Sequence, residues 1–241
     1  MNIGVIFAGG VGTRMRSKEK PKQFLEIFNK PIMMYTLDYF EQNEEIDAVV
    51  ISCVEEWIPY LKELLFKYRI EKVKKIVSGG RTGQLSIYNG LLAARDVAGD
   101  EPAVVLIHDG VRPLINSKLL SKNIECVRKN GSAITAGIVK ETIVVVDENN
   151  KVQLVPPREK SRVAKAPQSF WLQEILDIHE RALRDGIDNF IDSCTMMQHY
   201  GKKLCMVDGP YENIKITTPD DFYTMRAILE AKENAQIYGI D

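Results

Sequence analysis

Short apolar runs alternate with segments of helical periodicity through most of the first 140 residues. Residues 3–7 form a continuous apolar stretch that leads directly into glycines, which is typical of a buried strand. Apolar side chains then recur on one helical face over residues 32–40. Further strands are expected at 48–53, 73–77, 103–107 and 133–139, with helical patterns between them. This alternation predicts an α/β fold with a mostly parallel sheet covered on both faces.

Residues 140–162 interrupt the alternation. Two runs rich in valine, 142–146 and 152–155, flank the polar turn 147–150 without a helix between them, which predicts a hairpin. An arm of this length has too few residues for a core of its own, so we expect it to pack on its parent domain or on another subunit. A homodimer is therefore expected.

The remaining chain continues with further short elements. After Pro167 we expect two helical stretches, short strands near 204–207 and 213–217, and a final helix that begins at Pro219. No internal repeat, low-complexity tract or linker separates these parts. The length of 241 residues fits one compact α/β domain, so residues 1–241 are expected to form a single domain with the hairpin arm at about 140–162.

Composition narrows the class of protein. Hydrophobic residues make up 45% and charged residues 27% of the chain, which are ordinary values for a soluble globular protein. Lys and Arg total 32 against 33 Asp and Glu, so no global positive charge favours nucleic acid or an anionic membrane. The four cysteines are far apart, and the N-terminal apolar run is too short for a signal or a membrane span. We expect a cytoplasmic protein without membrane insertion.

A local basic patch follows the first strand. The segment AGGVGTRMRSKEKPKQF, residues 8–24, holds five positive residues against one acidic residue between positions 14 and 22. Its glycines allow backbone N–H groups to approach an anion, and its cations can neutralise that anion. A polyphosphate ligand is predicted here, and the alternative is a solvated basic loop. The candidate nucleotide-binding residues of this segment are Ala8, Gly9, Gly10 and Gly12.

Two common nucleotide-binding motifs fit this segment poorly. A P-loop ends in Gly-Lys followed by Ser or Thr, whereas Gly12 is followed by Thr13 and Arg14. A dinucleotide fingerprint needs a third glycine and an acidic residue about twenty positions later. Met15 occupies the third glycine position, and Asp38 falls within a helical pattern. A Rossmann-type nicotinamide-dependent reductase is therefore a weaker alternative.

A second candidate site is LIHDGVRP, residues 106–113. Asp109 ends a buried strand that should lie near the middle of the sheet, where a carboxylate can hold Mg²⁺. The alternative is that Asp109 caps a turn, and His108 is expected to be structural. Arg112 either pairs with a nearby acid or binds a second anion. The three histidines are spaced unsuitably for zinc.

Four motifs occur in order along the chain: AGGVGTRM with PKQ, then HDGVRP, PQSF and NIKITTPDD. Together they resemble the cytidylyltransferases that act on sugar-alcohol phosphates, the family of ribitol-5-phosphate cytidylyltransferase and 2-C-methyl-D-erythritol 4-phosphate cytidylyltransferase. The resemblance covers essentially the whole chain. It implies a Rossmann-like nucleotidyltransferase fold, a homodimer with exchanged arms, and transfer of CMP from CTP to an alditol phosphate with release of pyrophosphate.

The resemblance also assigns roles on the nucleotide side. By motif match, Arg14, Lys22 and Lys215 would bind the triphosphate and stabilise charge at the α-phosphorus. Asp109 would bind Mg²⁺, the implied cofactor. The residues that would face the nucleoside are Gly80 and Ser86.

On the acceptor side, Arg112, Thr142 and Arg158 match positions that bind the acceptor phosphate, and Asp192 matches an acidic position beside the acceptor pocket. Thr142 and Arg158 lie in the predicted arm. The nucleophile in such a reaction is a phosphate dianion, which needs no general base. Catalysis then requires charge neutralisation and alignment of two anions that repel each other.

The chain departs from the erythritol branch at three positions. Arg81 and Gly83 replace residues that contact the nucleoside in that branch, and Ile191 stands where that branch has a small hydroxyl residue. The spacing from Arg14 to Lys22 and the motif PQSF are similar to the ribitol branch. Ribitol 5-phosphate is therefore the expected acceptor, with 2-C-methyl-D-erythritol 4-phosphate as the alternative. A catalytically silent nucleotide-binding subunit is a further alternative.

Overall fold

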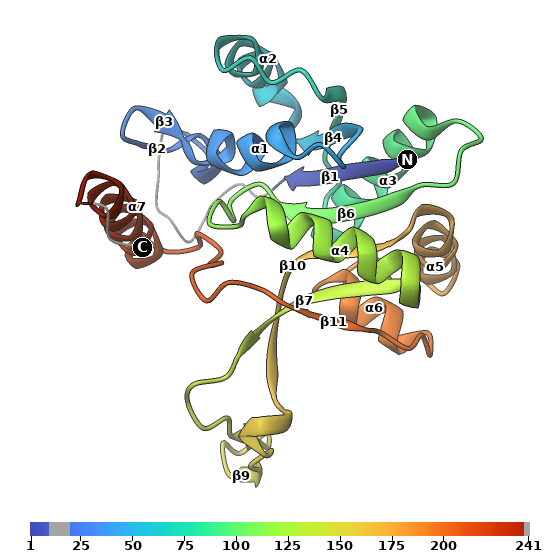
Figure 1. Ribbon diagram of the computed structural model, residues 1–241. Coiled ribbons are helices and arrows are strands. Elements are labelled where there is room, and N and C mark those ends of the chain that lie inside the picture. Colours follow the sequence, from blue (N-terminus) through green and yellow to red (C-terminus); the bar gives the residue numbers. More distant parts are fainter. Residues whose placement is uncertain (10–19, 239–241) are drawn as a thin grey trace.

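A computed structural model describes residues 1–9 and 20–238 of the chain (Figure 1). Gly10, Gly12 and Arg14 lie outside the described residues. The centre of the fold is a seven-stranded sheet. In spatial order its strands are β11 (Met206–Asp208), β7 (Ser132–Ile138), β10 (Arg162–Trp171), β6 (Val104–Asp109), β1 (Asn2–Ala8), β4 (Ala48–Cys53) and β5 (Val73–Ser78).

All neighbouring strands are parallel except at β10, which runs antiparallel to both β6 and β7. The expected α/β fold with a mostly parallel sheet is thereby confirmed. β6 lies in the middle of the sheet, as the sequence predicts, so Asp109 at its carboxyl end is central. This is the edge at which open α/β sheets bind ligands.

Helices cover both faces of the sheet. Their bounds are α1 (Ile32–Gln42), α2 (Ile58–Lys67), α3 (Gly83–Ala98), α4 (Ser117–Asn130), α5 (Leu172–Arg184), α6 (Ser193–His199) and α7 (Pro219–Tyr238). Because successive strand residues point to opposite faces, Ile6 packs with α1, α2 and α4, whereas Val5 packs with α3, α5 and α6. The C-terminal helix α7 packs against the segment that follows the carboxyl end of β6, where Met225 joins Val111 and Ile216 in a smaller apolar cluster.

In the second half of the chain, one strand is missing from the sequence prediction and one expected strand does not form. β10, the longest strand, is not predicted by the sequence pattern because Pro167 lacks the N–H that a ladder requires. The pairing with β7 shifts register between Ala164 and Gln168, which removes the proline from the ladder. Conversely, the strand expected at 213–217 does not form. This segment is joined to the chain after β6 by a backbone hydrogen bond from Ile216 N–H to the Val111 oxygen at 2.8 Å, and a single bond of this kind does not make a β-ladder.

The predicted hairpin is confirmed. β8 (Val145–Val146) and β9 (Val152–Leu154) pair antiparallel, and the short helix η4 (Arg158–Lys160) follows them. The arm projects away from the sheet (Figure 1). Val152 and Leu154 are 65% and 55% exposed, so the arm leaves apolar side chains uncovered within one chain.

Four short elements complete the description: η2 (Lys22–Phe24), β2 (Glu26–Ile27), β3 (Lys30–Pro31) and η3 (Glu55–Trp57). In the described part of the chain, no helix combines the length and apolar character needed to span a membrane.

Candidate active site

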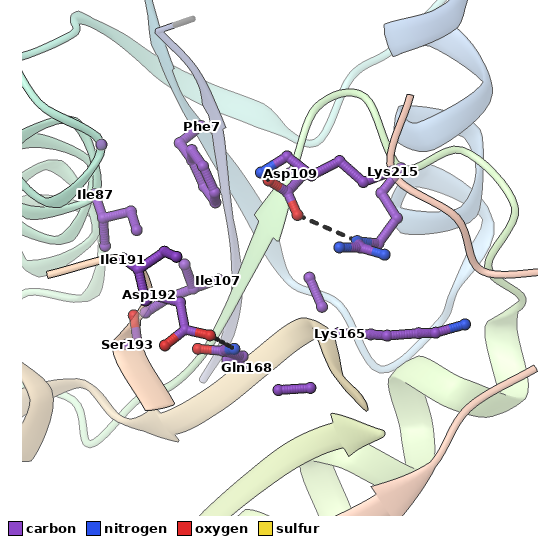
Figure 2. A pocket seen from close by; sticks show the side chains of 14 residues that line it. Phe7, Ile87, Ile107, Asp109, Lys165, Gln168, Ile191, Asp192, Ser193 and Lys215 are labelled. Atoms are coloured by element: carbon purple, nitrogen blue, oxygen red, sulfur yellow. Dashed lines mark hydrogen bonds and ion pairs between the residues drawn. The ribbon is translucent and has the colours of Figure 1, made fainter. Parts of the chain in front are cut away.

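A cavity of about 290 Å³ opens at the carboxyl ends of β1 and β6 (Figure 2). Its floor includes Phe7 and Ile107 from these strands. Residues of β10, the first residues of α3 and α6, and Lys215 form its walls. The sheet thus places the cavity at the carboxyl end of β6, where Asp109 and Arg112 of the HDGVRP motif line it.

An ion-paired cluster lies at one side of this cavity. Asp109 is buried, and Lys215 Nζ lies 2.5 Å from its Oδ1. Arg112 donates from Nε to Asp109 Oδ2 at 3.1 Å. Burial alone raises the pKa of Asp109, but Lys215 and Arg112 outweigh it and hold the pKa at about 2. The carboxylate is therefore ionised, and two cations against one anion leave the cluster with net positive charge.

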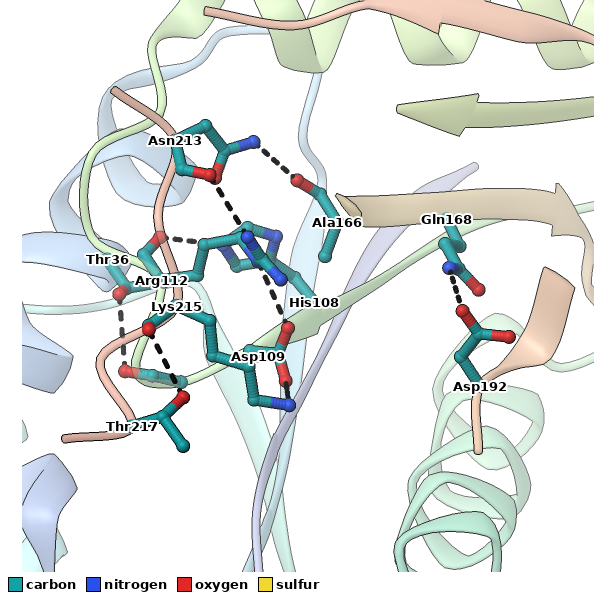
Figure 3. Close-up of polar contacts among 11 residues, drawn as sticks. Thr36, His108, Asp109, Arg112, Ala166, Gln168, Asp192, Asn213, Lys215 and Thr217 are labelled. Carbon is teal, nitrogen blue, oxygen red and sulfur yellow. Dashed lines mark hydrogen bonds and ion pairs between the residues drawn. The ribbon is translucent and has the colours of Figure 1, made fainter. Parts of the chain in front are cut away.

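Hydrogen bonds from neighbouring segments fix this cluster (Figure 3). Arg112 donates from Nη1 to the Asn213 carbonyl oxygen at 3.0 Å. Asn213 is fully buried and donates from Nδ2 to the Ala166 oxygen at 2.8 Å. Thr36 Oγ1 donates to the Gly110 oxygen at 3.2 Å. Segment 213–217, β10 and the turn after β6 are thereby joined, and this positions Lys215 over Asp109.

His108 has a structural role, as expected. Its ring is fully buried beside Phe40, and its Nε2 donates to the Arg112 carbonyl oxygen at 3.0 Å. Burial lowers its pKa to about 4. The ring is neutral near pH 7 and helps to hold the turn that carries Arg112.

The described ends of the basic segment are anchored beside the cluster. β1 ends at Ala8, and buried Gln23 donates from Nε2 to the Ala8 oxygen at 2.9 Å. Lys22 is the first residue of η2, adjacent to that anchor. At Gly9 a Cβ atom would lie 2.7 Å from Ser86 Oγ, so glycine allows the close approach of this strand end to α3.

Gly80 and Ser86 occupy the same corner. Gly80 N–H donates to Ser86 Oγ at 3.0 Å, and Ser86 Oγ donates to the Thr82 oxygen at 2.9 Å. Thr82 caps α3 by accepting from the Leu85 N–H at 3.1 Å. The structure therefore brings Gly9, Gly80 and Ser86 together at one end of the site.

The structure locates the three residues that differ from the erythritol branch, and two of them line the cavity. Arg81 is ion-paired with Asp188, and its side chain is largely exposed and does not line the cavity. Gly83 lines the cavity at the start of α3, and a Cβ there would meet nothing within 4 Å. Ile191 also lines the cavity and is 89% exposed.

Asp192 lies on the opposite wall from Asp109 (Figure 3). Its Oδ1 caps α6 by accepting from the Thr195 N–H at 2.8 Å, and its Oδ2 accepts from Gln168 Nε2 at 3.0 Å. Gln168 Oε1 in turn accepts from the Cys194 N–H at 2.8 Å. The carboxylate is thus held rigidly at the cavity by β10 and α6.

Thr142 and Arg158 are brought together, but not at this cavity. Arg158 donates from Nη2 to Thr142 Oγ1 at 3.1 Å, and both side chains are exposed on the arm. Neither lines the cavity of its own chain. Asp109, Arg112, Asp192 and Lys215, by contrast, all line it.

Four polar residues at the site have no role assigned from sequence. Gln23, Gln168 and Asn213 fall inside the motifs PKQ, PQSF and NIK, so their presence in a motif was the available signal. Their hydrogen bonds join segments that are distant in sequence. The fourth, Lys165, lines the cavity from β10 and lies outside every motif.

Comparison with known proteins identifies the family. The family model described as IspD, 2-C-methyl-D-erythritol 4-phosphate cytidylyltransferase, matches residues 3–231. The chain belongs to this family. A ribitol-5-phosphate cytidylyltransferase of Streptococcus agalactiae serotype Ia is 55% identical over 240 residues, which is 100% of both chains. A 2-C-methyl-D-erythritol 4-phosphate cytidylyltransferase of Clostridium botulinum is 40% identical over 229 residues, covering 95% of this chain and 97% of the relative.

The IspD family also accounts for the architecture. The crystal structure of 4-diphosphocytidyl-2C-methyl-D-erythritol synthase from Anaerococcus prevotii has a TM-score of 0.83 and 29% identity, and the match covers 95% of this chain and 96% of that one. This IspD-family protein is a nucleotidyltransferase with a Rossmann-like fold. Asp38, which a nicotinamide reductase would need at a strand end, lies within α1 and is ion-paired with Lys30.

Proposed function

We propose that this IspD-family enzyme transfers CMP from CTP to ribitol 5-phosphate and releases pyrophosphate. The cluster of Asp109, Arg112 and Lys215 carries the proposal, because it places net positive charge at the carboxyl end of the central strand. Two phosphate groups must meet at such a site. The ribitol acceptor is favoured over the erythritol acceptor by the higher identity to the ribitol-named relative, 55% against 40%. Because CTP is a cytoplasmic metabolite, we place the reaction in the cytoplasm.

Charge neutralisation and alignment are sufficient for this reaction. The acceptor phosphate is a dianion near neutral pH, so its attack on the α-phosphorus needs no general base. His108 is buried and hydrogen-bonded to backbone, which suits a structural role. Lys215 is held in place by Asp109 before substrate arrives, and such preorganised charge stabilises a transition state without reorganisation at the moment of reaction. Arg14 and Lys22 would add positive charge at the triphosphate.

Mg²⁺ fits the site as an ion carried by the triphosphate. No group of three or more His, Cys, Asp or Glu side chains in residues 1–9 and 20–238 could hold a metal alone. Mg²⁺ is commonly bound through one or two carboxylates together with substrate phosphates. Asp109, ionised and directed at the cavity, is the carboxylate that would hold it. The ion would supply further neutralisation of phosphate charge.

We further propose a homodimer in which the arm completes the partner's site. Arg158 and Thr142 do not line the cavity of their own chain, yet a guanidinium and a hydroxyl are suited to a phosphomonoester. The exposed Val152 and Leu154 give the arm an apolar surface that a second copy of the chain would cover. Arg158 and Thr142 would then bind the acceptor phosphate in trans.

A panel of alditol phosphates tests the function. The enzyme is incubated with CTP, Mg²⁺ and each acceptor, and pyrophosphate release is measured, with reactions lacking acceptor as the control. We expect ribitol 5-phosphate to give the highest kcat/KM. A higher value with 2-C-methyl-D-erythritol 4-phosphate would instead support the erythritol function. Binding of CTP without turnover of any acceptor would indicate a silent nucleotide-binding subunit.

A further inference from the structure

Lys165 lies in the part of β10 where the regular hydrogen-bonded pairing with β7 is interrupted. The ladder between β10 and β7 is interrupted between Ala164 and Gln168. An interruption of this kind redirects side chains from the usual alternation. Here Ala164, Lys165 and Ala166 all contribute to the cavity wall, which a regular strand would not allow for three successive residues.

The lysine side chain has a defined path along β7. A Cβ atom at Gly137 would lie 2.8 Å from Lys165 Cε and 3.2 Å from its Nζ, so the chain passes directly over this glycine. The ammonium donates to the Tyr211 carbonyl oxygen at 3.0 Å. In Figure 2 the side chain extends away from Asp192. The lysine therefore belongs to the side of the cavity where Arg112 and Lys215 lie.

The charges around Lys165 favour an anion. Burial and the positive charge of Arg112 both lower the pKa of Lys165. Lys215 and Arg112 share the single negative charge of Asp109, whereas Lys165 forms no ion pair within the described ranges, and nearby Glu212 pairs with Lys232 at 3.7 Å. One carboxylate therefore leaves the positive charge of Arg112, Lys165 and Lys215 only partly neutralised. Two partly desolvated cations that repel each other are stabilised by an anion placed between them.

We propose that Lys165 is an acceptor-binding residue whose ammonium, together with Arg112, binds the phosphate of the alditol phosphate. This role rests on the proposed function. The nucleoside is expected at the corner formed by Gly9, Gly80 and Ser86, whereas Lys165 comes from β10, the strand that also holds Asp192 through Gln168. A phosphomonoester dianion has the charge to match both cations.

Two substitutions at Lys165 test the proposal. Lys165→Met removes the charge and keeps a similar chain length, and Lys165→Arg keeps the charge. Loss of a hydrogen bond to a charged group predicts about a tenfold to hundredfold rise in KM for ribitol 5-phosphate in Lys165→Met. The Kd for CTP, measured calorimetrically with Mg²⁺, should change less than about twofold, because Lys165 would not contact the nucleotide. Lys165→Arg should restore most of the acceptor affinity.

Gly137→Ala provides a second, independent variant, because the added methyl group would displace the ammonium without removing it. It should also raise KM for the acceptor. Lys75→Met is the matched control, since Lys75 lies on the far edge strand β5, where it pairs with Asp96 at 2.5 Å. Thermal unfolding of each variant verifies the fold.

Titration with inorganic phosphate separates this proposal from the proposed function. If the wild type releases no pyrophosphate with ribitol 5-phosphate, the proposed function is wrong, but weaker phosphate binding by Lys165→Met than by wild type would still support the lysine's role. Unchanged phosphate affinity and unchanged acceptor KM in Lys165→Met would overturn it. A rise in the CTP Kd without a rise in the acceptor KM would also overturn it.

Discussion

Asp109→Asn tests the electrostatics of the site through protein stability. The substitution keeps the shape of the side chain and removes its charge, which leaves Lys215 and Arg112 without their shared carboxylate. The pKa of Asp109 falls from 3.8 to about 2 on folding. At 1.36 kcal/mol per pKa unit, the ionised carboxylate contributes about 2 kcal/mol to the free energy of unfolding near neutral pH.

The sign of the pH dependence follows from the lowered pKa. The unfolded chain binds this proton more tightly than the native state does, so the contribution is complete above pH 3.8 and is lost as the pH falls through about 2. About 1 kcal/mol of it should be gone at pH 3. The asparagine does not titrate. The difference in unfolding free energy between wild type and Asp109→Asn should therefore shrink by about 1 kcal/mol from pH 6 to pH 3.

Urea unfolding followed by tryptophan fluorescence measures this difference at both pH values. One protein concentration and one ionic strength are used throughout, since assembly would make apparent stability depend on concentration. Asp100→Asn, at an exposed position between α3 and β6, is the control for the loss of a surface carboxylate. If the difference for Asp109→Asn is the same at pH 6 and pH 3, the two cations do not stabilise an ionised Asp109, and the electrostatic reasoning fails.

Three further predictions concern the reaction. Lys22→Ala should lose roughly 10²-fold or more in kcat, the scale for one preorganised donor, and near-normal turnover with an intact circular dichroism spectrum would contradict its placement at the triphosphate. Exhaustive chelation should abolish turnover and added Mg²⁺ should restore it; an unchanged rate would mean that Asp109 is structural. Mixing inactive Lys22→Ala and Arg158→Ala under subunit exchange should recover activity, because a heterodimer would contain one undamaged site. No recovery after exchange verified by mass spectrometry would show that each residue serves its own chain's site.

The sequence was sufficient for the central part of the fold. Continuous apolar runs identify β1, β4 and β6, because strands buried on both faces carry no polar alternation. Their order places Asp109 in the middle of the sheet. The motif HDGVRP also predicts an acid and an arginine close together, and Arg112 does pair with Asp109.

β10 could not be predicted because its stabilising contacts are distant in sequence. Pro167 and two buried polar residues argue against a central strand. Ser169 is satisfied by Asn123 Oδ1 at 3.1 Å and Gln168 by Asp192, which only tertiary structure supplies. Lys165 was missed for a related reason, since no local pattern signals a lysine redirected by an irregular strand. At 213–217 the sequence predicts a strand that the structure lacks. The alternating Ile214 and Ile216 are typical of a strand, but here they pack on the small apolar cluster beside α7 and the segment has no ladder partner.

The connection between β7 and β10 has a consequence for protein engineering. Arg162 pairs with Ile138 at the last position of their antiparallel ladder, so the two strands already form a hairpin and the arm is an enlarged loop at its tip. Closing a shorter loop costs less conformational entropy, and the ladder itself supplies the register. The arm can therefore be treated as an interchangeable cassette: a tight turn in place of residues 139–161 would leave the sheet and the cavity as a minimal scaffold. Arms from other chains could then be grafted at the same two strand ends.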